Sequence, residues 1–177
     1  MTKTGVILLS SLAFLITGCH AGNKIFKAYA YSQPVFPGAK IVTETDESGN
    51  LKYPETRQKN NYYIYAVTDP DKEIEITDLW IEGIHFTAKT EIIGKTPVEK
   101  NYPDEFEKIK PDTLVPYTTR KVRLLLPGDN TTKTGNPAPA LPSKYKQYNL
   151  VIGFRVNQKL KFCAIKHFTS LNPMVTQ

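Results

Sequence analysis

The stretch ITDLWIEGIHFTAK, residues 76–89, decides the fold class. Glu82-Gly83 in its middle fits a two-residue hairpin loop, because glycine adopts a positive φ without strain. This loop places apolar or small residues opposite each other on one face: Ile81 with Ile84, Leu79 with Phe86, and Thr77 with Ala88. The predicted pairs on the other face are Trp80 with His85, Asp78 with Thr87, and Ile76 with Lys89. A slip of one residue would scramble this segregation, so the pattern also predicts the register.

The rest of the chain from Ile25 onward repeats this pattern of short strands between turns, with no convincing helical period. We expect strands at 25–31, 40–45, 62–68, 73–81, 84–93, 97–100, 120–126, 148–156 and 160–168, and a long loop over 127–144. Residues 62–67 are apolar on both faces, as in a central strand. The spacing is typical of an antiparallel β-sandwich. An immunoglobulin-like topology fits the strand number, although the Cys…Trp…Cys core of true immunoglobulin domains is absent.

A second hairpin is predicted near the C-terminus. A three-residue loop over 157–159 would pair Val156 with Leu160, which gathers apolar residues on one face. A two-residue loop would instead place Arg155 opposite Leu160. The sequence therefore favours the longer loop, because antiparallel sheets commonly have one apolar face.

Composition fits one globular domain. The chain has 177 residues, of which 40% are hydrophobic and 23% charged. Lys3 is the only charged residue before Cys19, which leaves 22 basic and 17 acidic side chains, or +5, in the remainder. This charge serves solubility or favours anionic neighbours such as lipid headgroups and acidic glycans. We expect no nucleic-acid partner.

The N-terminal residues are organised differently. A single lysine in residues 1–4 precedes thirteen mostly apolar residues, 5–17. This composition is typical of a secretory signal peptide, and the run is too short for a membrane span. The end of this run and the two residues after it, Ile16-Thr17-Gly18-Cys19, resemble the lipobox of bacterial lipoproteins.

The resemblance implies cleavage between Gly18 and Cys19 and a diacylglycerol on the Cys19 sulfur, with two or three acyl chains giving stable anchoring. We therefore expect a signal peptide over 1–18, a lipidated tether over 19–24 and one β-sandwich domain over 25–177. Six tether residues span at most roughly 20 Å, so the domain would lie close to the bilayer. His20 stands where aspartate retains enterobacterial lipoproteins in the inner membrane. The expected location is thus the bacterial cell envelope, at the outer membrane facing the periplasm. The mature domain loosely resembles small Bacteroidota β-sandwich lipoproteins, which share no agreed activity.

Residues suited to catalysis or metal binding are few. The three histidines, at 20, 85 and 167, lack the spacing of a metal site. The segment 46–50 lacks the bidentate glutamate of a calcium loop. We predict no catalytic residue, no metal and no cofactor. Because Cys19 is expected to be lipidated, Cys163 is expected to be a buried apolar side chain without an intramolecular disulfide.

Trp80 beside His85 is the best candidate for a binding feature. An exposed tryptophan stacks on sugars or anchors protein partners, whereas a loop or second sheet over it would make it part of a core. The favoured function is a non-catalytic, membrane-anchored module that binds or supports an envelope protein. The alternative is a glycan- or peptidoglycan-binding module that uses an aromatic patch around Trp80. An enzyme using scattered carboxylates is the least favoured.

Overall fold

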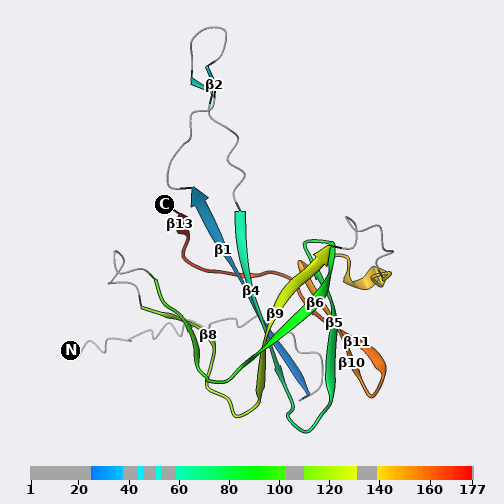
Figure 1. The fold of residues 1–177 in the computed structure, drawn as a ribbon. Helices are drawn as coiled ribbons and strands as arrows, with labels where there is room; N and C mark the ends of the chain where they lie inside the picture. The colour runs from blue at the N-terminus through cyan, green and yellow to red at the C-terminus, as the bar shows by residue number, and fades with distance from the viewer. Residues whose placement is uncertain are drawn as a thin grey trace, which may run out of the picture.

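The computed structural model describes residues 25–37, 44–45, 51–52, 59–102, 110–130 and 139–176. These residues form an all-β fold (Figure 1). The strands are β1 (Phe26–Pro37), β2 (Glu44–Thr45), β3 (Leu51–Lys52), β4 (Lys59–Thr68), β5 (Ile74–Ile81), β6 (Ile84–Ile93), β7 (Val98–Lys100), β8 (Asp112–Val115), β9 (Lys121–Asn130), β10 (Leu150–Val156), β11 (Lys159–Ile165), β12 (Thr169–Ser170) and β13 (Met174–Thr176). A 3-10 turn, η2 (Ser143–Tyr145), precedes β10. The expected signal peptide, the cleavage site at Gly18-Cys19 and the tether lie outside the described residues.

The main sheet has the strand order β11-β10-β5-β6-β9-β4-β1-β12, with β13 also beside β1. Its long strands pair antiparallel, while β12 and β13 run parallel to β1. The seven long strands follow the order of an immunoglobulin sandwich, with β1, β4, β9 and β6 in the A, B, E and D places and β5, β10 and β11 in the C, F and G places. Because β6 also pairs with β5, the two halves remain one sheet.

This sheet curls so that its two halves face each other. Phe26 of β1 stacks on Phe154 of β10 with ring centroids 4.2 Å apart, although four strands separate β1 from β10 in the sheet order. The space between the halves is the main core. Its buried members are Phe26, Ala28, Ala30, Ile64, Ala66, Ile74, Ile76, Leu79, Ile81, Leu125, Leu150, Ile152, Phe154, Val156, Cys163 and Ile165. The sandwich-like packing explains why inward-facing positions alternate along each strand.

The predicted β5–β6 hairpin is confirmed from the pair Ile81–Ile84 to the pair Asp78–Thr87. Glu82 and Gly83 form its turn with φ values of 51° and 81°. The two outermost predicted pairs, Thr77–Ala88 and Ile76–Lys89, do not form. β5 instead bulges against β10, where Gly153 pairs with Asp78 and the next residue pairs with Ile76. A bulge reverses which face the following side chains take, and Ile76 therefore lies in the core and not on the outer face.

The three-residue loop predicted for the C-terminal hairpin is wrong. Val156 pairs with Lys159 across the two-residue turn Asn157-Gln158, whose φ values are 49° and 65°. Such left-handed pairs match the twist of antiparallel hairpins. As a result Phe162 pairs with Gly153 and faces away from the core, while Cys163 faces into it. The prediction failed because the outer face of β11 is not polar.

Other strand limits differ from the sequence expectation. β1 continues to Pro37, six residues beyond the end expected at residue 31, because β4 and β13 pair with its C-terminal half. β9 continues to Asn130 through the start of the predicted long loop and bulges against β6. The short strands β3, β8, β12 and β13 were not expected from the sequence.

The β7–β8 ribbon builds a second, smaller core on the outer side of the sheet. Leu114 and Val115 of β8 are buried there against Tyr65 and Val67 of β4. The Tyr31 hydroxyl of β1 donates to the Leu114 carbonyl at 2.7 Å and fixes the ribbon in place. β4 is thus covered on both faces, as its continuous apolar sequence predicts for a central strand.

Candidate functional site

The β5–β6 hairpin places Trp80 and His85 side by side, with ring centroids 4.7 Å apart. Both lie on the outer face of the sheet, as the register predicts. Each is only 4% exposed, so Trp80 is not the exposed platform that one of the two interpretations of the sequence required. Trp80 is covered by other parts of the chain, which is the alternative that the sequence left open.

The cover comes from β11 and from the segment 139–148, which contains η2. Phe162 lies 6.0 Å from Trp80, and Tyr145 lies 5.2 Å from Phe162, measured between ring centroids. Tyr148 follows at 6.2 Å from Tyr145. These distances fall in the range of favourable aromatic pairs. We call Trp80, Phe162, Tyr145 and Tyr148 the aromatic layer.

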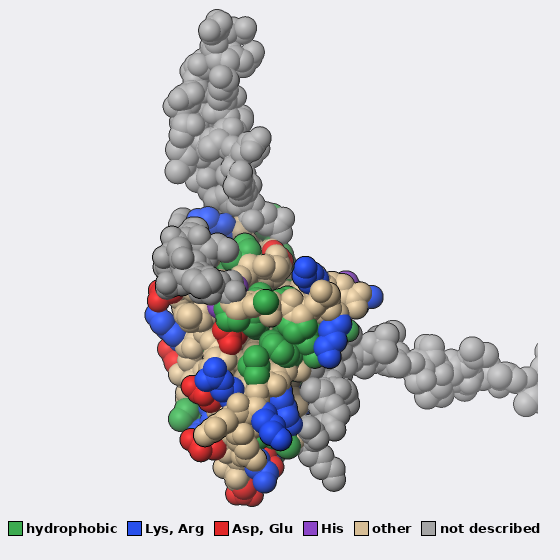
Figure 2. All heavy atoms as spheres, turned by 90° about the vertical axis from the view of Figure 1, so that its right-hand side faces the viewer, with side chains coloured by type: hydrophobic (Ala, Val, Ile, Leu, Met, Phe, Trp, Pro, Cys, Tyr) green, Lys and Arg blue, Asp and Glu red, His purple; other side chains and the backbone are tan. Residues whose placement is uncertain are grey.

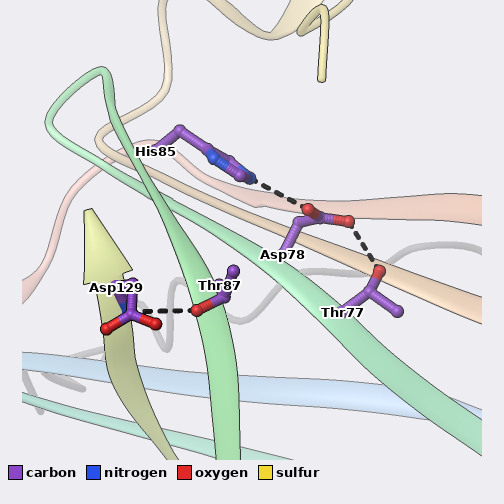
Figure 3. A network of polar contacts seen from close by, with 5 residues as sticks. All are labelled: Thr77, Asp78, His85, Thr87 and Asp129. Carbon is purple, nitrogen blue, oxygen red and sulfur yellow. Dashed lines mark hydrogen bonds and ion pairs between the residues drawn. The ribbon is translucent and has the colours of Figure 1, made fainter. Parts of the chain in front are cut away.

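Asp78 is the centre of a polar network beneath this layer (Figure 3). His85 Nε2 lies 2.9 Å from Asp78 Oδ1, and Thr77 Oγ1 donates to Asp78 Oδ2 at 2.6 Å. The β5 bulge makes this possible because it brings two consecutive side chains, those of Thr77 and Asp78, close together. Nucleophile activation requires an imidazole between the hydroxyl and the carboxylate. Here the carboxylate lies between the other two groups, so the network holds side chains in place and does not activate Thr77.

Two glycines sit where the outer face is most tightly packed. A Cβ on Gly153 would lie 3.1 Å from Asp78 Cβ and 3.2 Å from Trp80 Cζ3. A Cβ on Gly128 would lie 2.6 Å from Thr87 Oγ1. That hydroxyl accepts a hydrogen bond from the Asp129 backbone N–H at 3.0 Å, at the edge of the same face (Figure 3). Both bulges therefore depend on a residue without a side chain.

A second polar cluster lies on the opposite half of the sheet. Gln33 is buried, its Nε2 donates to the Asn172 carbonyl at 2.8 Å, and its Oε1 accepts from the Tyr63 hydroxyl at 3.0 Å. Burial, then the neighbouring Tyr29 and Asp112, raises the pKa of Tyr31 to about 12. Burial and a hydrogen bond to Asp112 raise the pKa of Tyr102 to about 12. These contacts tie the C-terminal segment to the sheet, and no buried side-chain nitrogen or oxygen atom of the described residues lacks a hydrogen-bond partner.

Two open grooves lie at the end of the sandwich where β1 begins. One has a volume of about 800 Å³ and is lined by Glu73, Glu75, Arg155, Asn157 and Gln158. The other has a volume of about 580 Å³ and lies between the start of β5 and β9, where Lys121 and Arg123 line it. The exposed pair Arg155–Glu75, at 3.7 Å, contributes little. Mixed charges without a buried polar centre make these grooves poor candidates for a catalytic site.

The described residues offer neither a metal-binding cluster nor a membrane-spanning helix. They contain no group of three or more His, Cys, Asp or Glu side chains that could hold a metal ion. Nor does any helix in them reach the length and apolarity of a membrane span.

Cys163 is fully buried, as predicted. The expectation that it forms no disulfide is wrong for this structure, in which Cys163 is disulfide-bonded. Cys19 is the other cysteine of the sequence and lies outside the described residues. A disulfide and a lipid thioether cannot share one sulfur atom, so a lipidated Cys19 could not be the disulfide partner of Cys163.

The aromatic layer is the feature that sequence reasoning found only in part. Of its members, Trp80 was a candidate from the sequence, whereas Phe162, Tyr145 and Tyr148 were not. The signal for the last two is the segment Lys144-Tyr145-Lys146-Gln147-Tyr148, which places two aromatic residues between the end of the predicted loop at 144 and the start of the predicted strand at 148. No protein-family model matches the chain, and searches of curated proteins and of solved structures likewise found no significant match.

Proposed function

We propose that this protein is a lipoprotein of the bacterial cell envelope, anchored through Cys19 at the outer membrane and facing the periplasm, whose β-sandwich binds or supports another envelope protein. The observation that carries the proposal is the apolar run over 5–17, whose last two residues form the motif Ile16-Thr17-Gly18-Cys19 with the two residues that follow. This arrangement specifies both export and a lipid attachment site, which a cytoplasmic β domain does not need.

The fold is compatible with a short anchor. β1 begins at Phe26, seven residues after Cys19. The β4–β5 loop lies at the same end of the sandwich, because the Asp69 N–H donates to the Ile25 carbonyl at 3.0 Å. In an anchored chain this end would face the bilayer. The β5–β6 turn and η2 lie toward the opposite end (Figure 1) and would point away from the membrane.

A binding role fits the described side chains better than catalysis. The polar network centred on Asp78 consists of structural contacts that hold Thr77 and His85 in place. The two grooves are open and carry mixed charges. The glycan alternative depended on Trp80 as an exposed stacking platform, and a tryptophan that is 4% exposed offers no such platform.

Metabolic labelling with radioactive palmitate tests the anchor. Wild type and Cys19→Ala are compared in a bacterial host, with Cys163→Ala as the matched control for loss of a cysteine. We expect label in the wild type and in Cys163→Ala and none in Cys19→Ala, with Cys19→Ala released from the membrane fraction. Undiminished labelling of Cys19→Ala, or no labelling of the wild type, would contradict the proposal.

A further inference from the structure

The outer surface of the aromatic layer is apolar and accessible. Leu160 on β11 is 50% exposed. Phe162 lies two residues further along the same face of β11, and it and the neighbouring rings of Tyr145 and Tyr148 are partly buried. Figure 2 views the side of the molecule that carries β10 and β11, and hydrophobic side chains gather in the middle of it. Contiguous exposed apolar side chains are typical of interaction sites.

This surface is held rigidly from below. Phe162 rests on Trp80, which is itself buried beside His85 and the Asp78 network. The covering segment is also ordered, because the Tyr145 N–H donates to the Pro142 carbonyl at 2.9 Å and the Tyr148 N–H to the Tyr145 carbonyl at 3.1 Å. A preorganised surface loses little conformational entropy when a partner binds.

Lysines border this surface. Lys144 and Lys146 flank Tyr145 and are exposed. Lys144 Nζ lies 4.9 Å from the centre of the Tyr145 ring. Within the described part of the chain, the ion pairs are His85–Asp78 and Arg155–Glu75, so neither lysine is neutralised by a described carboxylate. Lys and Arg side chains line one edge of the hydrophobic area in Figure 2.

We propose that the lysine–aromatic patch, defined as Leu160, Phe162, Tyr145, Tyr148, Lys144 and Lys146, docks an acidic segment of another protein. Aliphatic or aromatic side chains of the partner would cover Leu160 and Phe162. Its carboxylates would lie against Lys144 and Lys146, where complementary charge favours encounter and register. A second copy of this chain would bring lysines against lysines and is therefore disfavoured. The inference rests on the proposed binding role and names its surface.

Site-specific photocrosslinking in intact cells tests this docking site. A benzophenone amino acid replaces Leu160 in the full chain, and the same residue replaces Ile92 as the control. Ile92 is 68% exposed and lies on β6, away from the patch. We expect a discrete heavier adduct from position 160 and none of that size from position 92. Mass spectrometry of the adduct should identify a protein with an acidic segment at the crosslink.

Charge reversal separates specific docking from chance proximity. In the double variant Lys144→Glu, Lys146→Glu, the adduct from position 160 should fall by roughly fivefold or more, because like charges would then face each other. An unchanged adduct, no adduct, or the same adduct from both positions would overturn the docking site.

Two further probes distinguish other ligands. Sedimentation of the purified full chain with phosphatidylglycerol vesicles or with peptidoglycan sacculi should not depend on Lys144 and Lys146. Retention that the double variant abolishes would assign the patch to a membrane or a glycan and overturn the protein partner. Palmitate labelling of the same cells keeps the two proposals apart. If the protein is labelled but forms no crosslinked adduct, only the docking site is contradicted. If it forms the adduct but is not labelled, only the lipid anchor is contradicted.

Discussion

Replacing Gly153 by alanine should destabilise the protein through overpacking of the outer face. The added Cβ would lie 3.1 Å from Asp78 Cβ, 3.2 Å from Asp78 Oδ2 and 3.2 Å from Trp80 Cζ3. None of these atoms moves easily, because Asp78 is held by Thr77 and His85 and Trp80 is buried between the sheet and Phe162. Gly153 does not have a positive φ, so the substitution changes packing without adding backbone strain.

The expected loss follows from two opposing effects. Overpacking of a well-filled site costs about 1–3 kcal/mol. Alanine recovers about 0.4–1 kcal/mol by restricting the unfolded chain. The free energy of unfolding should therefore fall by about 1–2 kcal/mol.

Urea denaturation followed by tryptophan fluorescence measures this change at the site itself, because Trp80 is the only tryptophan of the chain. Gly94→Ala is the matched control, since a Cβ there meets nothing within 4 Å. By the same restriction of the unfolded chain, it should raise the free energy of unfolding by about 0.4–1 kcal/mol. Equal stability of the Gly153 and Gly94 variants would refute the close packing of Gly153 against Asp78 and Trp80.

Three further outcomes are expected. Leu79→Ala, at a fully buried core position, should lower the free energy of unfolding by about 2–5 kcal/mol in the same urea assay. The pKa of Tyr31 is raised from 10.0 to about 12, so the folded state holds this proton more tightly than the unfolded state does. The free energy of unfolding should therefore fall as the pH rises from 10 to 12. Tyr31→Phe should make that fall shallower in urea titrations across this pH range. The double variant Lys144→Glu, Lys146→Glu should keep the wild-type urea midpoint, because both side chains are exposed, and a large midpoint shift would show that they stabilise the fold.

The first hairpin was predictable because its turn and its alternation agree. Glu82-Gly83 fits a two-residue loop, and only one register separates the apolar face from the other. The bulge in the same strand also leaves a signal in the spacing of the apolar residues. Apolar residues occur at 74 and 76 and then at 79 and 81, and the step of three between Ile76 and Leu79 marks the change of face.

The register of the C-terminal hairpin and the identity of the residues that cover Trp80 could not be predicted by local reasoning. Both depend on the segment 139–148, which is about sixty residues from Trp80 in sequence and covers the outer face of β10 and β11 through Tyr145. Without that cover, an outward-facing Phe162 looks unfavourable, and the longer loop is the better local solution. Side-chain pairing inside a hairpin is encoded nearby, whereas what packs on its outer face is set by the tertiary fold.

Mass spectrometry of the N-terminal peptide, taken without reduction from protein extracted from native membranes, tests the proposed anchor most directly. We predict a peptide that begins at Cys19 and carries diacylglycerol on its sulfur. A peptide that continues upstream of Gly18, or one in which Cys19 is disulfide-bonded to Cys163, would contradict it.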